Sequence, residues 1–261
     1  MNMRNSLRFR LGWAALLLSI VTMLVAGTGV ALAEDDAQGK RAYMPAVMLQ
    51  RPPAMDCNAP GASFTTLSIA GPPLTVDPET NRDLNLGVRG YIRINAALQL
   101  KNLGPVHDAK APQLWGMFGD KRTPVFTSAY NADRGPNPLW EVTLLGMGTK
   151  PGEVIYTPDS GYDIGGGYEY LVLYAAPTRV TLHIGREDEL FGYVVHIEDV
   201  CVDPDLVALY RQSHAAGRHS LPALRGHAPF GRASGNEVKA AVRDWGLFLD
   251  ARSRNDWWQG R

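Results

Sequence analysis

The sequence predicts a mostly β protein, built as an antiparallel sheet, barrel or sandwich with one covering helix, and three stretches carry this prediction. Tyr168–Tyr174 is apolar almost throughout, which is typical of a strand covered on both faces. Val180–Ile184 and Tyr193–Glu198 alternate apolar and polar residues, and this period of two sends successive side chains to opposite faces. We therefore expect three adjacent strands at the centre of the fold.

The start of the chain has the three parts of an export signal. Arg4, Arg8 and Arg10 precede the apolar stretch 11–30, and Ala31-Leu32-Ala33 supplies a small-x-small cleavage site. We expect cleavage after Ala33 and a secreted, extracytoplasmic protein associated with the cell envelope. An uncleaved membrane anchor is the alternative, since about 20 apolar residues also suffice to cross a bilayer.

Four segments are expected along the chain. Residues 1–33 form the signal peptide, 34–60 an extended tether, 61–150 a first β-rich part and 151–261 a second one. The tether is predicted from its four prolines, which oppose regular helix and favour extended chain. Strand-like patterns in the first β-rich part cover Phe64–Ile69, Tyr91–Leu100 and Leu139–Leu145.

The second β-rich part contains the one predicted helix, near residues 204–216. Asp203 is a suitable N-cap, Pro204 suits the first turn, and Gly217 can end the helix. Its expected sheet-facing side chains are Leu206, Leu209 and Tyr210. Further strands are expected at Glu237–Val242 and Trp245–Leu249, the second continuing the first as a hairpin.

The charge and the cysteines limit the classes of function. The chain has 26 basic and 26 acidic residues, and removal of the signal takes away three arginines, leaving 23 − 26 = −3. Such a balance is unlike the basic footprint of a nucleic-acid binder. Cys57 and Cys201 are the only cysteines, and export to an oxidising compartment predicts that they form a disulfide. Two separate buried thiols are the alternative.

Two histidines and two glutamates form the strongest polar constellation. His183, His196 and Glu198 occupy the non-core face of the two alternating segments, and Glu187 lies in the loop between them. Two imidazoles and a carboxylate could bind zinc if they converged. Polar residues also occur on the wet face of an antiparallel sheet, and we favour that interpretation, with no metal and no other cofactor.

Trp257 and Trp258 are the candidate aromatic contacts. Near the end of the chain they can cap the core, or they can present their ring faces to sugars. We favour packing, and we retain sugar contact as the alternative.

Three pieces of the second β-rich part resemble the β-barrel core of lysostaphin-type peptidoglycan endopeptidases: GEVIYTPDSG (152–161), LRGHAPFGRA (224–233) and NEVKAAVRDWGLFLDARS (236–253). That family binds zinc through a His-x-x-x-Asp motif and a His-x-His motif. Here the stretch Trp140–Thr149 contains neither His nor Asp, and Glu237 and Lys239 stand at the His-x-His positions. Because a lysine ammonium has no free lone pair, the resemblance implies the scaffold without the metallopeptidase chemistry.

The function that we predict is a non-catalytic cell-envelope binding module. This prediction combines the export signal, the extended tether, the aromatic residues and the missing zinc ligands. The module's expected partner is a glycan, peptidoglycan or a surface protein, with no nucleic acid and no membrane contact except through an uncleaved signal. One alternative is a hydrolase with a site near His183, His196 and Glu198. Another is a structural or assembly protein.

Overall fold

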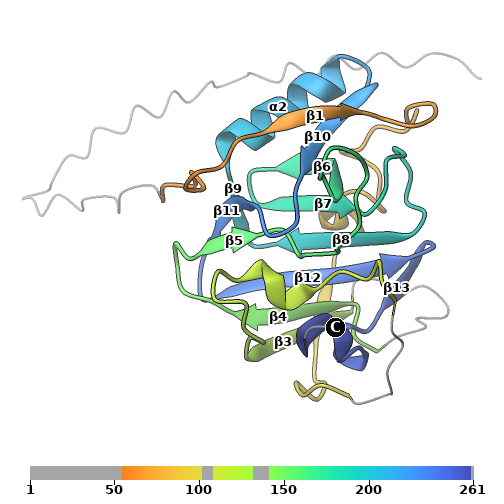
Figure 1. Ribbon diagram of the computed structural model, residues 1–261. Helices are drawn as coiled ribbons and strands as arrows, with labels where there is room; N and C mark the ends of the chain where they lie inside the picture. Colours follow the sequence, from red (N-terminus) through yellow and green to blue (C-terminus); the bar gives the residue numbers. More distant parts are fainter. Residues whose placement is uncertain (1–54, 102–107, 132–140, 260–261) are drawn as a thin grey trace, which may run out of the picture. The chain divides into compact units, whose positions relative to one another are not determined.

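The computed structural model describes residues 55–101, 108–131 and 141–259, which belong to one compact unit, Pro53–Arg261. The predicted signal peptide and residues 34–54 of the predicted tether lie outside the described residues. The described part of the chain has thirteen strands, in two antiparallel sheets, so the predicted mostly β class is confirmed (Figure 1). No helix in these ranges is long and apolar enough to cross a membrane.

The larger sheet has ten strands, and sequence-distant strands are neighbours in it. Its order is β1 (Thr65–Ser68), β10 (Ser220–Leu224), β6 (Tyr170–Ala176), β7 (Arg179–His183), β8 (Tyr193–Glu198), β12 (Glu237–Asp244), β4 (Leu144–Gly148), β3 (Phe126–Asn131) and β2 (Ile92–Ile94), with β13 (Leu247–Leu249) paired to β12. Because β12 lies between β8 and β4, both predicted β-rich parts contribute to one sheet.

The three central strands are adjacent, as the alternation predicts. β6, β7 and β8 are hydrogen-bonded neighbours, and their ends differ from the predicted ones by no more than a few residues. Val180 and Leu182 of β7 and Val195 of β8 are buried in the main core. The hairpin predicted for Glu237–Val242 and Trp245–Leu249 is also present, with Asp244 of β12 paired to Leu247 of β13.

The smaller sheet contains β5 (Val154–Tyr156), β11 (Pro229–Ala233) and β9 (Val200–Val202), with β11 in the middle. The first two pieces that carry the peptidase resemblance pair with each other here, since Pro229 lies opposite Tyr156. The third piece forms β12 and β13 of the larger sheet.

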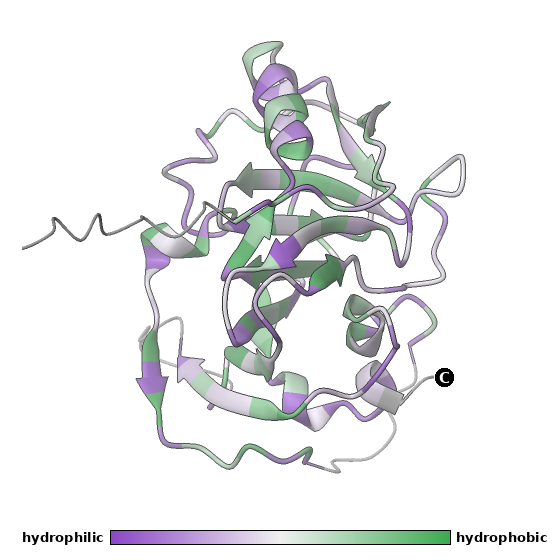
Figure 2. Cartoon of the chain, turned by 90° about the vertical axis from the view of Figure 1, so that its left-hand side faces the viewer, coloured by the Kyte–Doolittle hydropathy of each residue, from purple (hydrophilic) through white to green (hydrophobic). Residues whose placement is uncertain are grey.

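Helix α2 (Pro204–Ala215) covers β10 and β6 and contains both hydrophilic and hydrophobic residues (Figure 2). The Asp203 carboxylate caps it by accepting from the Asp205 amide, and its other oxygen accepts from the Ala59 amide at 2.7 Å. Leu206 and Tyr210 are buried as expected, while Leu209 is half-buried. The remaining helices are short: α1 (Leu86–Arg89), α3 (Asp256–Gln259) and the 3-10 turns η1 (Leu114–Met117) and η2 (Ala251–Ser253).

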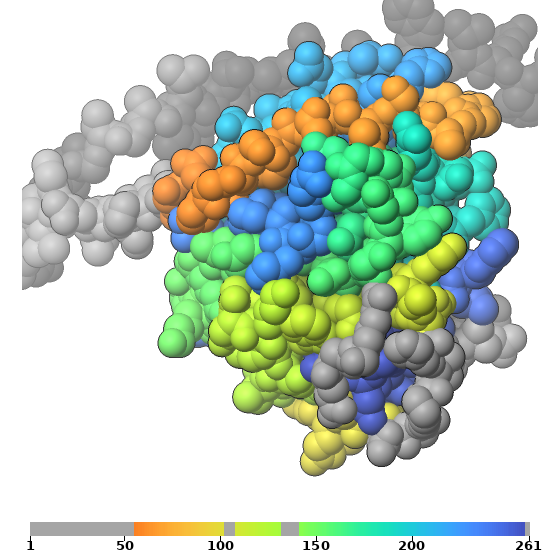
Figure 3. Space-filling view, in the orientation of Figure 1, coloured from red at the N-terminus to blue at the C-terminus, as the bar shows by residue number. Residues whose placement is uncertain are grey.

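A disulfide joins Cys57 to Cys201, with 5.2 Å between their Cα atoms. The predicted pairing is therefore present, and it fastens the segment before β1 to β9. In Figure 3 this N-terminal segment, residues 55–70, runs over the surface beside α2. Arg232 supports the attachment by donating to the Asn58 carbonyl at 2.8 Å.

Both faces of the central strands are covered. The main core lies on one face, and a small second cluster of Leu86, Leu144 and Ala241 lies on the other, bordered by the rings of Tyr91, Tyr130 and Phe248. The segment around α1 crosses this second face, where the Leu84 carbonyl accepts from Thr181 Oγ1 at 2.5 Å. The prediction of a wet polar face on β7 and β8 is therefore wrong.

Candidate functional site

The register of β7 and β8 determines how the predicted polar residues lie. Thr181 is opposite His196, and Arg179 is opposite Glu198. Directly paired residues project from the same face, so His183, His196 and Glu198 share a face as expected. That face is buried by the segment around α1 and by Phe248 of β13, whose ring centroid lies 6.2 Å from that of His196.

His183 and His196 have different hydrogen-bond partners. His183 Nδ1 lies 3.1 Å from the Glu187 carbonyl oxygen, and its Nε2 lies 2.5 Å from the Phe191 carbonyl oxygen. The two contacts close the loop between β7 and β8 onto the ring. In residues 55–101, 108–131 and 141–259, no group of three or more His, Cys, Asp or Glu side chains is arranged to hold a metal ion.

The protonation of His196 follows from its neighbours. Thr181 Oγ1 donates to the Leu84 carbonyl, which can only accept. The 3.0 Å contact between this hydroxyl and His196 Nδ1 must then be donated by the ring, which leaves Nε2 as a buried acceptor without a hydrogen-bond partner. Burial, with help from the Arg243 charge, lowers the pKa of His196 well below its ordinary value. A neutral ring of this kind is a core residue.

The Glu198 carboxylate is buried on the shared face. Burial raises its pKa to about 7, against the attraction of Arg179, while the nearby Asp199 raises it further and Lys239 lowers it. Arg179 Nε lies 3.2 Å from Glu198 Oε2. The charged form of Glu198 is therefore costly in the folded protein.

We expect Glu198→Gln to stabilise the protein above neutral pH. A carboxyl whose pKa rises from 4.5 to about 7 on folding contributes stability below pH 4.5 that is lost as the pH rises through about 7, a difference of about 3 kcal/mol. The gain at pH 8 is about this amount, because the raised pKa already includes the attraction of Arg179. Urea unfolding of both proteins at about pH 4.5 and pH 8 measures it; an equal difference at both pH values would contradict the assignment.

Trp257 and Trp258 are buried, with exposed fractions of 0% and 1%. Trp258 Nε1 donates to the Ala251 carbonyl at 2.8 Å, and its ring packs edge-on against Phe126. The favoured packing role is confirmed, and sugar contact at these two rings is wrong, because no ring face is open to solvent.

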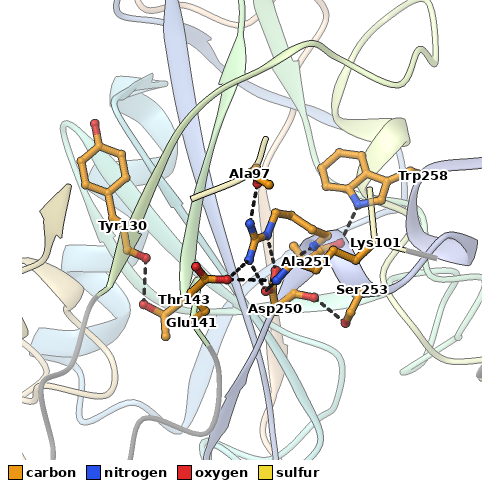
Figure 4. Close-up of polar contacts among 10 residues, drawn as sticks. Ala97, Lys101, Tyr130, Glu141, Thr143, Asp250, Ala251, Ser253 and Trp258 are labelled. Atoms are coloured by element: carbon orange, nitrogen blue, oxygen red, sulfur yellow. Dashed lines mark hydrogen bonds and ion pairs between the residues drawn. The ribbon is translucent and has the colours of Figure 1, made fainter. Parts of the chain in front are cut away.

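A buried charge network supports the turn under Trp258 (Figure 4). Arg252 donates from Nε to Asp250 Oδ1 at 2.9 Å and from Nη2 to Asp250 Oδ2 at 2.6 Å. It also donates to Glu141 at 3.0 Å and to the Ala97 carbonyl. These partners use four of the five N–H donors of the guanidinium, so the network holds the C-terminal turn rather than forming an open site.

In the described part of the chain, the exposed aromatic residues lie elsewhere, at Phe191 and Trp245, with exposed fractions of 58% and 71%. Phe191 is in the loop after β7, and Trp245 is in the two-residue turn between β12 and β13. Trp245 and Gly246 have φ of 48° and 81°, as a type I′ turn requires. The two ring centroids are 5.6 Å apart, so segments distant in sequence form one aromatic pair.

This pair borders a cavity of about 420 Å³, which we call the aromatic cleft. Tyr162 and Tyr193 add two further aromatic rings to its lining. Its charged lining residues are Asp108, Lys110, Asp163, Arg186, Glu187 and Asp244. His183 and Glu187 also line it, so the structure brings two of the four predicted polar residues to the cleft and leaves His196 and Glu198 outside its lining.

The polar groups of the cleft are held by local contacts. Asp163 Oδ1 accepts from the amides of Gly165 and Gly167 at 2.7 and 3.0 Å. The Lys110 ammonium lies 4.4 Å from the centroid of the Tyr162 ring. Charged groups with fixed positions around aromatic rings are the usual composition of a ligand site.

Sequence reasoning missed Phe191 and Trp245 as site residues. A usable signal was present, because both are large aromatic residues within the connections of alternating hairpins, Gly185–Gly192 and Asp244–Gly246. Aromatic residues at such turns have no core to enter. Comparisons of the chain with protein-family models, with curated proteins and with solved structures found no match.

Proposed function

We propose that this protein is a non-catalytic glycan-binding module of the cell envelope, and that the aromatic cleft is its binding site. The observation that carries the proposal is the Phe191–Trp245 pair, exposed beside a cavity of about 420 Å³. Large exposed aromatic residues are unfavourable on a surface that binds nothing, and they commonly mark interaction sites.

A sugar fits the two kinds of surface that the cleft combines. Its C–H face is apolar and packs on an aromatic ring, while its hydroxyl groups need hydrogen-bond partners. Trp245 and Phe191 offer the first surface. The carboxylates of Asp108 and Asp244 in the same lining offer acceptors for the second.

The alternative of a hydrolase at His183, His196 and Glu198 gains no support from this arrangement. Thr181 lies directly opposite His196 on the shared face and is hydrogen-bonded to it. His183 is closed onto its own loop through two backbone carbonyls. At the positions matching zinc ligands in the resembled family, Glu237 accepts from Ser128 at 2.6 Å and Lys239 pairs with Asp199. The contacts of these residues within the fold therefore favour a structural role for them over a catalytic one.

Placement in the cell envelope is supported by two observations of different kinds. The first 33 residues have the pattern of an export signal. The Cys57–Cys201 disulfide is of the kind that persists in oxidising compartments. Extraction of the native host's extracytoplasmic fraction, with detection of the protein there, tests this part of the proposal.

We expect Trp245→Ala to weaken glycan binding by about 2 kcal/mol, or roughly 30-fold in Kd. The ring is mostly exposed, so its loss should remove the contact surface without opening the core. The measurement is a pelleting isotherm of the mature protein with purified peptidoglycan, with assay of the soluble fraction for released fragments.

Val125→Ala is the matched control, because Val125 is an exposed apolar residue, 77% accessible, outside the cleft lining. It should bind like the parent protein. Equal binding by the parent and the Trp245 variant would remove the cleft from the proposal. Release of soluble fragments by the parent would show that the module is catalytic.

A further inference from the structure

The charge of the aromatic cleft restricts the kind of glycan that it can accept. Four carboxylates line it, from Asp108, Asp163, Glu187 and Asp244, against the two cations of Lys110 and Arg186. This inference rests on the proposed glycan-binding function and concerns the ligand class of the same site.

The two cationic side chains of the lining already contact other groups of the protein. Lys110 lies over the ring of Tyr162, and Arg186 Nε donates to the Ser68 carbonyl at 3.2 Å. A ligand with negative charge would therefore meet carboxylates first, and it would have to draw these cations from their present contacts.

Asp108 and Asp244 are two of the four carboxylates in the lining, and their charges repel each other. Burial raises the pKa of Asp244, and repulsion from Asp108 raises it further, although Arg254 and the Trp245 amide act in the opposite direction. Asp108 Oδ1 accepts from the Lys110 amide at 2.9 Å, and burial, followed by the Asp108 charge, raises the pKa of the Tyr193 hydroxyl in the same lining. Two carboxylates that repel each other gain free energy when a cation binds near both of them.

We propose that the aromatic cleft selects glycans that carry free, protonated amino groups, as in de-N-acetylated amino sugars, over N-acetylated or uronic acid glycans. An aromatic face attracts a cation through its quadrupole, and Trp245 follows Asp244 directly in the chain. Because the ring and both carboxylates line one cleft, a ligand bound there meets all three groups. Complementary charge of this kind gives selectivity between ligands of equal size.

The test is calorimetric titration of the mature protein with three oligosaccharides of equal length, made of glucosamine, N-acetylglucosamine and glucuronic acid. At about pH 6 the amines are protonated and most carboxyls are ionised. We expect the glucosamine oligomer to bind at least tenfold more tightly than the N-acetylated one, and its advantage to shrink at high salt. Uronate binding should be the weakest.

Asp244→Asn should reduce the affinity for the glucosamine oligomer about tenfold and leave that for the N-acetylated oligomer unchanged. Glu189→Gln is the matched control, since it makes the same change of charge on the neighbouring loop but outside the cleft lining; it should preserve the preference. Trp245→Ala should weaken both oligomers.

The outcomes separate the two proposals. Trp245-dependent binding with equal affinity for the amine and the N-acetylated oligomer would overturn the charge selectivity and keep the glycan-binding function. A preference for the uronate would do the same. Absence of Trp245-dependent binding to every oligomer and to peptidoglycan would overturn the function itself and the inference with it.

Discussion

Arg218→Met is expected to lower the free energy of unfolding by about 3–5 kcal/mol, because it breaks a fully buried ion pair. Arg218 and Asp188 have side-chain exposures of 3% and 0%. The guanidinium donates to both carboxylate oxygens of Asp188, at 2.7 and 2.6 Å. Methionine keeps the apolar stem but leaves the carboxylate without its cation.

The pair matters for the cleft as well as for stability. Asp188 belongs to the loop that carries Glu187 and Phe191, and its Oδ2 also accepts from the Leu74 amide at 3.1 Å. Arg218 reaches from the end of α2 to the Leu173 carbonyl of β6 and the Tyr210 hydroxyl. Contacts with the Leu74 amide, and through Arg218 with β6 and α2, thus hold the loop beside the aromatic pair. A substitution that loosens this loop should also weaken glycan binding.

Urea unfolding of the parent and of Arg218→Met measures the effect. Arg211→Ala is the control, since Arg211 is exposed on α2, the helix that precedes Arg218, and it should change the stability by no more than about 0.5 kcal/mol. The double variant Asp188→Leu with Arg218→Met should recover part of the loss, because it removes both buried charges. A loss below about 1 kcal/mol for the single variant would show that the pair is not a major support of the fold.

The sequence identified strands that have a clear local pattern, including β1, whose partner β10 is far away in the chain. β7 and β8 alternate cleanly and are joined by one loop, so local periodicity sufficed. β10 and β11 contain Pro222 and Pro229, and proline argues against a strand in a sheet interior. Pro222 instead lies opposite Thr66 of β1, more than a hundred residues away in the chain, which no local pattern indicates.

The sequence-based prediction of a solvent-exposed polar face was wrong for a related reason. Alternation gave the correct shared face for His183, His196 and Glu198, but whether a face is wet depends on what crosses it. Here the chain around Leu84 and α1 covers it. Likewise, Trp245 is exposed because a tight turn with positive φ carries it, whereas Trp257 and Trp258 are covered by Tyr193 and Phe126 from other strands.

Replacement of both Cys57 and Cys201 by serine is the second change expected to have a large effect, a loss of about 4 kcal/mol. The cross-link joins residues 144 positions apart. In the chain-entropy model, closing so long a loop removes much of the freedom of the unfolded chain, and the stabilisation lies at the upper end of the range for disulfides. The urea midpoint of the double serine variant measures this loss; the disulfide prediction would be contradicted if the midpoint equalled that of the parent under oxidising conditions.

The loss of stability should arise mainly in the unfolded state, because in the folded state the segment before β1 keeps its other attachments. Ala59 still donates to Asp203, Arg232 still donates to Asn58, and β1 still pairs with β10. The cleft lies outside these contacts, so the serine variant should bind glycan with unchanged affinity at temperatures where it is folded. A loss of glycan affinity together with the loss of stability would instead mean that the disulfide holds the cleft itself. Hydrogen exchange at the Ala59 amide would distinguish a local detachment of the N-terminal segment from that longer-range effect.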